Sequence, residues 1–423
     1  MGNCQKRLAS RIRPRKAGDE IHVASGTYLP TDAPDDSTAD DRDKAFHLNA
    51  DVVLKGGYNP DTDTQDYTNP SILSGDLGMP DDDTDNAFHV LITVSLTAAA
   101  TIDGFSISGG NANGGGSNLI YSSQTFFRLF GGGLYNISSS PTITNSTFSG
   151  NRSSADGGGM FNSSSSPTIT NSTFSGNDAA IAGGGLYNNS SSSPTITNST
   201  FSGNSAKNGG GMYNDDSSFP TLNNTVLYAN TADADDNLYG TINGGSSSHN
   251  ASDGTDGGIN LLSGFVALTS EEDPFTDSTN PAGADGIFGT ADDGLIPHGT
   301  SPLIDAGDDT KNDEETDITG GARVMDSAID IGAYEGQSSL HSDGPVVETI
   351  TLYPNPTSSA VNLSYATATN TNYSLYDISG KRLATYEQSG TTHQIDVSGY
   401  EKSTYILKAI SGLQVNYYRI VKK

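Results

Sequence analysis

The sequence predicts an all-β protein in which a long parallel β-helix is followed by a small immunoglobulin-like β-sandwich. Two observations carry this prediction: a repeat in the middle of the chain and a change of composition near residue 345. With 423 residues, the chain has room for more than one domain. Between residues 131 and 230, Gly triplets recur every 26 residues, starting at positions 131, 157, 183 and 209. A fixed period of about 20–50 residues indicates a stack of structural repeats.

Each repeat contains two short segments with the composition of β-strands, Leu-Tyr-Asn after the glycines and Pro-Thr-Ile-Thr-Asn-Ser-Thr-Phe further on. Thr, Ile, Tyr and Phe favour strands, and the Thr-Ile-Thr alternation at 142–144 points Ile143 to one side of the chain. A Gly triplet inside a helix would cost about 1 kcal/mol per residue relative to Ala. One repeat cannot bury its own apolar side chains, so it must stack on its neighbours. We therefore predict one coil of β-helix per repeat, with successive coils about 4.8 Å apart.

Side chains that recur at the same place in every repeat are predicted to form rows inside the solenoid. The apolar rows are Ile143, Ile169, Ile196 and Leu222, and Phe148, Phe174, Phe201 and Leu227. The Asn side chains that follow are predicted to form a hydrogen-bonded ladder from coil to coil, made of Asn151, Asn177, Asn204 and Asn230. We interpret these rows as scaffold and expect no catalytic residue among them.

The repeat resembles a family of bacterial surface proteins. The Phe-Ser-Gly-Asn segments (148–151, 174–177 and 201–204) and the Gly-Gly-Gly-Leu or Gly-Gly-Gly-Met segments are similar to the FxxN and GGA[ILV] repeats of chlamydial polymorphic outer-membrane proteins. A third Gly stands where that family has Ala. The resemblance covers roughly the middle quarter of the chain. It implies a right-handed β-helix and suggests surface adhesion, but it assigns no catalytic residue.

The segments before the repeat resemble the first coils of bacterial pectate-lyase-like β-helices. Residues 18–28 fit the pattern Gly-Asp-x-Ile-x-Val-Ala-x-Gly-x-Tyr, and Gly-Gly-Tyr follows at 56–58. We therefore predict that the β-helix extends over residues 17–336. Residues 1–16 are basic and lack the apolar core of about 7–15 residues that a signal peptide has. We expect an atypical N-terminus with a misplaced or truncated start.

Composition excludes several classes of partner. The chain has 21 basic and 50 acidic residues, a net charge of −29 and an isoelectric point near 4.2. Such a charge repels phosphate backbones and anionic membranes, so we expect no nucleic-acid partner. The single Cys4 cannot form an internal disulfide. The most apolar run, residues 88–100, is shorter than the about 20 residues that a transmembrane helix needs.

One acidic loop is a candidate metal site. Asp285, Asp292 and Asp293 lie on Gly-rich turns, and flexible carboxylate loops of this kind suit Ca²⁺. Their spacing differs from that of an EF-hand. A structural calcium ion and a set of hydrated Asp turns are both compatible with the sequence. We expect no other cofactor.

Two later segments resemble those that close many secreted bacterial β-helices. Residues 301–308 (SPLIDAGD) and 323–335 (RVMDSAIDIGAYE) are similar to the SPAIDAG and IDIGAYE segments of those proteins. The resemblance implies that residues 245–336 are the C-terminal end and cap of the solenoid. A cap is also required physically, because an open end exposes unpaired strand edges. Residues 337–345 are predicted to be a polar linker.

The last segment, residues 346–423, has the alternating patterns of a small β-sandwich of about seven short strands. It resembles, over its whole length, the C-terminal sorting domain of type IX secretion cargo in Bacteroidetes. The matching positions are Tyr353, Pro354, Asn355, Pro356, Gly380, Lys381, Tyr405 and Lys422, while Ser403 stands where the family usually has Gly. The resemblance implies that the outer-membrane translocon of this system is a partner and that the protein reaches the cell surface or the extracellular space.

These observations lead to one principal hypothesis and two alternatives. The principal hypothesis is a secreted, surface-attached monomer that acts as an adhesin or binds glycan without catalysis, its partner being a polysaccharide or a host or neighbouring cell surface. The first alternative is a polysaccharide lyase or glycoside hydrolase with its site in the flanks, residues 17–125 or 235–300. The second is a structural rod. An enzyme is expected to show a cleft with converging carboxylates and a basic residue, and a binder a flat face lined by Tyr or Asn; a rod has neither.

Overall fold

The computed structural model describes residues 16–34, 40–79, 82–115, 118–269, 271–337, 351–378, 381–411 and 414–423. The chain divides into two compact units, residues 1–338 and 339–423. The division falls inside the predicted linker 337–345, of which only Gln337 is described. Of the predicted N-terminal segment 1–16, only Lys16 is described.

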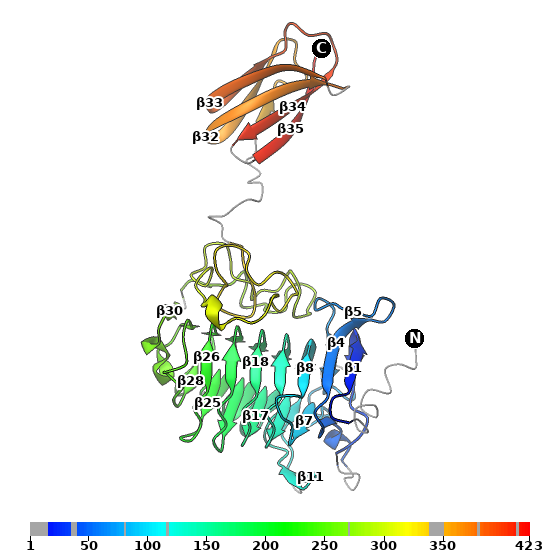
Figure 1. Cartoon of the computed structure of the whole chain (residues 1–423), viewed down its shortest axis with the longest axis vertical. Coiled ribbons are helices and arrows are strands. Elements are labelled where there is room, and N and C mark those ends of the chain that lie inside the picture. The colour runs from blue at the N-terminus through cyan, green and yellow to red at the C-terminus, as the bar shows by residue number, and fades with distance from the viewer. Residues whose placement is uncertain are drawn as a thin grey trace. The chain divides into compact units, whose positions relative to one another are not determined.

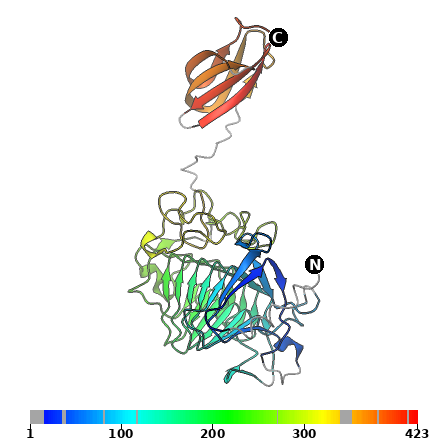
Figure 2. The ribbon, with the colours of Figure 1, turned by 45° about the vertical axis from the view of Figure 1, so that its right-hand side comes forward.

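The first unit is a solenoid of stacked β-coils (Figure 1). Each regular coil adds one strand to each of four parallel sheets, which we name C, A, B and D in the order in which the chain meets them. The coils follow one another from β1 (Glu20–Ala24) to β30 (Val266–Ala267), and the turned view shows the strands of successive coils lying side by side (Figure 2). The prediction of an all-β protein with a parallel β-helix is confirmed.

Sheet A carries the first apolar row. Ile143, Ile169 and Ile196 pair in register with one another and with Leu222, and all four are fully buried. The Thr residues on either side of each Ile point to the opposite face, because side chains alternate along a strand. The strands of sheet A are β1, β4 (Val53–Asn59), β8 (Thr101–Asp103), β14 (Thr142–Thr144), β18 (Thr168–Thr170), β22 (Thr195–Thr197) and β26 (Thr221–Asn223), with β5 (Thr64–Gln65) antiparallel to β4.

Sheet B carries the second apolar row. Phe148, Phe174 and Phe201 stack with their rings nearly parallel and their centroids 4.8 and 4.5 Å apart. Both predicted apolar rows are therefore confirmed. The strands of sheet B are β2 (Gly26–Tyr28), β6 (Ser71–Ser74), β9 (Phe105–Ser108), β15 (Thr147–Ser149), β19 (Thr173–Ser175), β23 (Thr200–Ser202), β27 (Val226–Tyr228), β29 (Ala251–Ser252) and β30.

Sheets C and D complete each coil. The strands of sheet C are β3 (Phe46–Leu48), β7 (Leu91–Val94), β13 (Leu134–Ile137), β17 (Met160–Ser163), β21 (Leu186–Asn189), β25 (Met212–Asn214) and β28 (Leu238–Tyr239). The strands of sheet D are β10 (Asn111–Ala112), β16 (Arg152–Ser153), β20 (Asp178–Ala182) and β24 (Ser205–Asn208). A separate antiparallel hairpin consists of β11 (Leu119–Tyr121) and β12 (Gln124–Phe126).

Amide side chains join consecutive coils inside the solenoid. Asn177 Oδ1 accepts from both the backbone N–H and Nδ2 of Asn151, each at 3.1 Å, and Asn204 and Asn230 continue the same pattern. The predicted Asn ladder is therefore confirmed. A second ladder, which the sequence analysis did not identify, links the buried amides of Asn136, Asn162, Asn188 and Asn214 at 2.8–3.0 Å.

The C-terminal end of the solenoid is closed by only part of the predicted cap. The 3-10 helix η2 (Asp256–Leu261) follows the last regular coils, and its Ile259 is buried in the core of the solenoid. Residues 271–337, which we name the lateral segment, do not extend the stack: they lie along its side (yellow in Figure 1). Ala333 N–H donates to Thr200 Oγ1 at 3.0 Å, and Asn171 Nδ2 donates to the carbonyl of Thr316 at 2.7 Å.

The outer face of sheet B explains why the lateral segment lies along the side of the stack and does not cap its end. Where earlier coils present Thr147 and Ser149 outward, β27 presents Val226 and Tyr228, and both are buried under the lateral segment. Burying apolar area stabilises the fold at about 25 cal/mol per Å². The resemblance located the segment along the chain, but it did not show which surface the segment covers.

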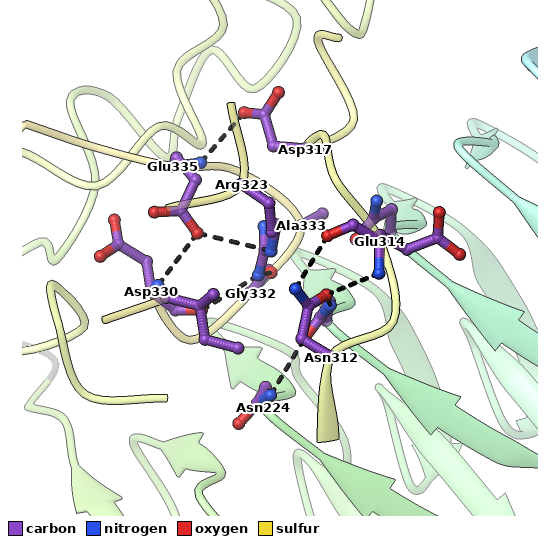
Figure 3. A network of polar contacts seen from close by, with 12 residues as sticks. Asn224, Asn312, Glu314, Asp317, Arg323, Asp330, Gly332, Ala333 and Glu335 are labelled. Atoms are coloured by element: carbon purple, nitrogen blue, oxygen red, sulfur yellow. Dashed lines mark hydrogen bonds and ion pairs between the residues drawn. The ribbon is translucent and has the colours of Figure 1, made fainter. Parts of the chain in front are cut away.

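A buried polar network holds the lateral segment together (Figure 3). Arg323 is 1 % exposed, and its Nη2 donates to the carbonyls of Gly332 and Asp330 at 2.7 and 3.1 Å. Its Nε lies 3.4 Å from Glu335 Oε1, which also accepts from the backbone N–H of Asp330. Burial raises the pKa of Asp330 to about 6 and raises that of Glu335 further, although the guanidinium of Arg323 favours both ionised forms. The short helix η3 (Asp309–Lys311) belongs to the lateral segment, whereas η1 (Asp41–Asp43) lies between β2 and β3 of the solenoid.

The second unit is antiparallel throughout the strands that the structure describes. Its core contains the fully buried side chains of Leu363, Leu375, Leu407 and Ile420. Its strands are β31 (Thr351–Tyr353), β32 (Ala360–Asp377), β33 (Arg382–Asp396), β34 (Thr404–Ser411) and β35 (Gln414–Val421). β32 pairs with β31, β33 and β34, which is consistent with the predicted small sandwich. The described strands are fewer and longer than predicted, since β32 has 18 residues and β33 has 15.

Candidate functional site

An enlarged loop interrupts the regular corner between sheets B and D in the early coils. In a repeat, the two residues Gly150 and Asn151 connect a strand of sheet B to one of sheet D. After β6, the chain instead enters a loop, residues 75–90, before it reaches β7. Gly75 begins this loop, and only Gly fits there, because an added Cβ would lie 2.5 Å from the carbonyl oxygen of Gly109. The loop therefore starts where two coils touch.

A cleft of about 450 Å³ lies between this loop and the B–D corner. Loop residues form one wall, and the ends of β9, β10 and β16 contribute to the other. The lining residues are Ser74, Asp76, Asp82, Asp83, Asn86, Ser108, Gly109, Gly110, Asn111, Gly150 and Arg152. All of them are polar or Gly. Such a wall suits a ligand rich in hydroxyl or amino groups rather than an apolar one.

Arg152 is the basic residue of the cleft. Its Nη1 lies 2.8 Å from Asp83 Oδ2, and Asn111 Nδ2 donates to the backbone carbonyl of Asp83 at 2.7 Å. Asp82 accepts from the hydroxyl and the backbone N–H of Thr84, at 2.6 and 3.0 Å, and these hydrogen bonds lower the pKa of Asp82. The cleft thus contains a carboxylate that stays ionised and an ion pair that joins the loop to the solenoid.

Two lining residues carry buried acceptor atoms that have no hydrogen-bond partner in the described parts of the chain. These atoms are Oδ1 of Asp76 and Oδ1 of Asn86, and Asn86 as a whole is 8 % exposed. An unpaired buried acceptor costs about 1–3 kcal/mol.

Arg42 fixes the loop from behind. Its Nε donates to the carbonyl of Asn86 at 2.5 Å, and its Nη2 donates to the carbonyl of Asn111 at 2.9 Å and to Asn113 Oδ1 at 2.7 Å. The guanidinium lies 4.2 Å above the ring of Phe88, a favourable cation–π arrangement. Arg42 is therefore a positioning residue that ties the loop to β10.

Carboxyl groups with raised pKa values lie outside the cleft. A general acid for glycoside cleavage needs a carboxyl whose pKa is raised towards the working pH. Among the described residues, burial raises the pKa of six carboxyl groups: Asp156, Asp293 and Asp330, each to about 6, and Asp235, Glu314 and Glu335. None of the six lines the cleft. The cleft has the polar groups for binding but no carboxyl tuned in this way.

The predicted calcium loop is held by its own backbone and by the lateral segment. Asp292 Oδ2 accepts from the N–H groups of Ala284 and Asp285, at 2.8 and 3.3 Å. Asp293 Oδ2 accepts from the hydroxyl of Tyr334 at 2.8 Å, and burial raises the pKa of Asp293 to about 6. Within the described ranges, no three or more His, Cys, Asp or Glu side chains are grouped so that they could hold a metal ion. A structural calcium ion at this loop stays a prediction.

The predicted sorting residues fall on the second unit. Asn355 exchanges two hydrogen bonds with the backbone of β35, at 2.7 and 2.8 Å. Lys422 Nζ donates to the carbonyls of Ser358 and Ser398, at 2.8 and 3.0 Å. Both side chains thus join the last strand to earlier parts of the unit. The other matching positions are Tyr353 at the end of β31, Pro354 and Pro356 after it, Lys381 before β33, Tyr405 in β34, and Gly380, which lies outside the described residues.

An outward-facing aromatic row runs along sheet C. Phe161, Tyr187, Tyr213 and Tyr239 stack face to face, with centroids 5.3, 4.8 and 4.5 Å apart. Because each ring covers the face of the next, the inner rings turn only their edges outward. Sugar rings stack on open aromatic faces. This row therefore does not form the flat Tyr-lined face that was expected of a binder.

Comparisons with known proteins agree with this architecture. Residues 90–264 match the family described as right handed beta helix region, and residues 351–423 match the family described as secretion system C-terminal sorting domain. No match was found among curated proteins. The chain is thus a right-handed β-helix protein that carries a type IX secretion sorting domain, and this domain implies export to the cell surface or the extracellular space. In the part of the chain that the structure describes, no helix has the length and hydrophobicity needed to cross a membrane.

The cleft residues were not identified by sequence analysis. Neither Arg152 nor the loop containing Asp82 and Asp83 was among the predicted site residues. A signal was present: a run of acidic residues at 81–85 interrupts the strand pattern between two apolar segments. What could not be inferred is that this loop lies against Arg152, which is 69 residues away from Asp83 along the chain.

Proposed function

We propose that this protein is a non-catalytic, adhesin-like glycan-binding protein of the cell surface, and that the cleft between residues 74 and 152 is its binding site. The observation that carries this proposal is the cleft of about 450 Å³ with a lining that is wholly polar or Gly. Glycan hydroxyls both donate and accept hydrogen bonds. The cleft offers acceptors on Asp76, Asp82 and Asn86, and donors on Arg152 and the amide of Asn111.

The state of the charged groups supports binding rather than catalysis. Arg152 is paired with Asp83 at 2.8 Å, so its charge is already partly neutralised. Hydrogen bonds from Thr84 keep Asp82 ionised to lower pH, which is the opposite of what a general acid requires.

The sorting domain supports the proposed location. Export places the β-helix outside the cell, where polysaccharides and neighbouring cells are the available partners. We propose a monomer attached to the outer surface, with the secretion translocon as a partner during delivery. The net charge of −29 supports solubility there.

A second candidate function is favoured by one observation. The cleft brings three Asp residues and one Arg together inside the flank in which a polysaccharide lyase or hydrolase site was predicted. Carboxylates and a basic residue are the groups that such enzymes use. This alternative requires that polymer ends form during incubation, which binding alone does not produce.

The test combines retention and cleavage in one experiment. Full-length protein is incubated with neutral, amino and uronate-containing polysaccharides, with calcium and with a chelator. Retention on the polymer and the appearance of new reducing or unsaturated ends are both followed. Retention without new ends is the expected result; new ends would replace our proposal with the enzyme, and the absence of retention on every polymer would refute it.

The chain offers a matched pair of variants for this test. Gly150 lines the cleft, and Gly176 occupies the same position one coil further on; both have positive φ, and an added Cβ meets no atom within 4 Å at either site. Gly150→Tyr and Gly176→Tyr therefore carry similar backbone strain, but only the first fills the cleft. We expect Gly150→Tyr to abolish retention and Gly176→Tyr to preserve it. Equal behaviour of the two variants would place the binding site elsewhere.

A further inference from the structure

We infer that the cleft selects glycans that carry free amino groups, such as deacetylated hexosamine polymers, over neutral and uronate-containing glycans. This inference rests on the proposed glycan-binding function and specifies the class of ligand. It is carried by the charge of the cleft and by the two unpaired acceptor atoms on its wall.

The charge of the cleft is negative. Asp76, Asp82 and Asp83 line it together with Arg152, so three carboxylates face one guanidinium and the described lining residues carry a net charge of −2. Arg152 is engaged by Asp83, which leaves Asp76 and Asp82 without a cationic partner among the described lining residues. Behind the loop, Arg42 is offset by Asp85 and other acidic neighbours. A uronate carboxylate would therefore meet like charges, within a chain that already carries −29.

The unpaired atoms require donors. Oδ1 of Asp76 and Oδ1 of Asn86 are buried and have no partner in the described residues, and Asn86 is 8 % exposed. An ammonium group has three donors and no acceptor, whereas a hydroxyl has one donor and also needs donors of its own. Hydrogen bonds between an ammonium and a carboxylate are about twice as strong as neutral ones. An amino sugar thus matches the charge of the cleft, and it brings donors to Asp76 and Asn86, the two lining residues that carry unpaired acceptor atoms.

N-acetylation would remove this advantage. The acetamide is neutral, keeps one N–H and adds a carbonyl acceptor, for which Arg152 is the charged donor in the cleft. That donor is engaged by Asp83. Among the described lining residues there is no aliphatic or aromatic side chain to receive the acetyl methyl group. The same absence favours a saccharide over a basic peptide, whose Lys side chains carry long apolar stems.

The experiment is calorimetric titration of the full-length protein in mildly acidic, low-salt buffer. The probes are a glucosamine tetrasaccharide, its fully N-acetylated form, a tetragalacturonate and tetralysine. We expect the free-amine tetrasaccharide to bind at least about tenfold more tightly than the acetylated one, since two charge-assisted contacts are lost on acetylation. Its affinity is expected to fall as the pH rises through the pKa of the sugar amine, because the ligand then loses its charge.

Two variants with opposite expected signs make the test specific. Asp76→Asn removes a carboxylate and is expected to weaken binding of the free-amine tetrasaccharide about tenfold. Arg152→Gln, at a side chain that is 59 % exposed, removes the positive charge, frees Asp83 and is expected to strengthen that binding. The matched control is Asp178→Asn, which removes a carboxylate at the position next to Arg152 in sheet D but outside the cleft lining. This control is expected to leave the affinity for the free-amine tetrasaccharide unchanged.

The outcomes separate this inference from the proposed function. Equal affinity for the free and acetylated tetrasaccharides, or tighter binding of the galacturonate, overturns amine selection but leaves glycan binding in place. Tighter binding of tetralysine than of the amino sugar overturns the assignment to a glycan. If no saccharide binds, both proposals fail. If Asp76→Asn does not fold, the inference is rejected when Arg152→Gln binds the free-amine tetrasaccharide more weakly, and not more tightly, than the unmodified protein does.

Discussion

The regular coils between residues 131 and 230 and the lateral segment 271–337 both belong to the first unit, but they are stabilised in different ways. In the coils, a residue packs against copies of itself: Phe174 lies between Phe148 and Phe201, with ring centroids 4.8 and 4.5 Å away. In the lateral segment, Arg323 is surrounded by unlike groups, including Glu335. Repetition therefore distributes stability along the stack, whereas the lateral segment concentrates it in a few unique contacts.

The largest expected effect is in the repeated part. Phe174→Ala removes a fully buried ring from the middle of its row and should lower the free energy of unfolding of the solenoid by about 3–5 kcal/mol. Chemical denaturation of the full-length protein, followed by circular dichroism, measures this change. Thr168→Ala, at an exposed position of sheet A, is the control and should cost less than about 0.5 kcal/mol. A similar loss in both variants would show that the buried row is not the main source of stability.

The second-largest expected effect is a loss of stability that is confined to the lateral segment. Arg323→Ala removes the donor to the carbonyls of Asp330 and Gly332 and leaves a cavity beside Glu335, at a cost of about 3 kcal/mol. Hydrogen exchange followed by mass spectrometry should show faster exchange in peptides from 271–337 and unchanged protection in 131–230. Faster exchange in both regions would contradict the conclusion that the coils and the lateral segment are stabilised by different contacts.

The third effect is a dependence on pH. Burial raises the pKa of Asp293 from its ordinary value of 3.8 to about 6, so the folded state binds the proton more tightly than the unfolded chain does. Its protonated form therefore contributes stability that is complete below the unfolded pKa and is lost as the pH rises through about 6, a change of about 2–3 kcal/mol. Limited proteolysis of the lateral segment should accordingly become faster across this range.

The variant Asp293→Asn checks the origin of that change. Asn is neutral at every pH, so this variant should show a flatter dependence of proteolysis on pH between about 4 and 6. An unchanged profile would assign the titration to another buried carboxyl, such as Asp330.

The smallest effect is expected on the outer aromatic row. Tyr213 is half-buried and stacks between Tyr187 and Tyr239. Tyr213→Ala should lower the free energy of unfolding by about 1 kcal/mol, because the stacking contacts are lost. Tyr213→Phe keeps the ring and should cost less, and the two variants are compared in the same denaturation assay. A larger loss from Tyr213→Phe than from Tyr213→Ala would assign the stabilising contact to the hydroxyl.

The same comparison explains what the sequence could predict. The spatial neighbours of a repeated residue such as Ile169 can be predicted from the repeat, because the residues in register with it are its own copies at Ile143 and Ile196. The coils, both apolar rows and the Asn ladder followed from this rule. The second ladder, through Asn162, was not predicted. Asn recurs there as well, in the short strand after the glycines.

The lateral segment and the cleft could not be predicted in this way. Arg152 meets Asp83 only because the loop 75–90 turns back across the B–D corner, and no periodicity encodes that turn. Similarly, the resemblance of residues 323–335 located the segment but not the face it covers. The apolar pair Val226 and Tyr228 at outward positions was the local signal that a covering segment exists.

The place where the chain leaves the solenoid has a mechanical consequence. Residues 332–334 lie against the middle coils, where Gly332 N–H donates to the carbonyl of Asn224 and Ala333 N–H donates to Thr200 Oγ1. A pulling force transmitted through residue 337 is therefore applied to the flank of the stack rather than to its terminal coil. Such a load first acts on the contacts of the lateral segment, and the ladders of the coils are spared until these contacts have yielded. The lateral segment would then act as a force-absorbing element between the solenoid and whatever holds its C-terminal side.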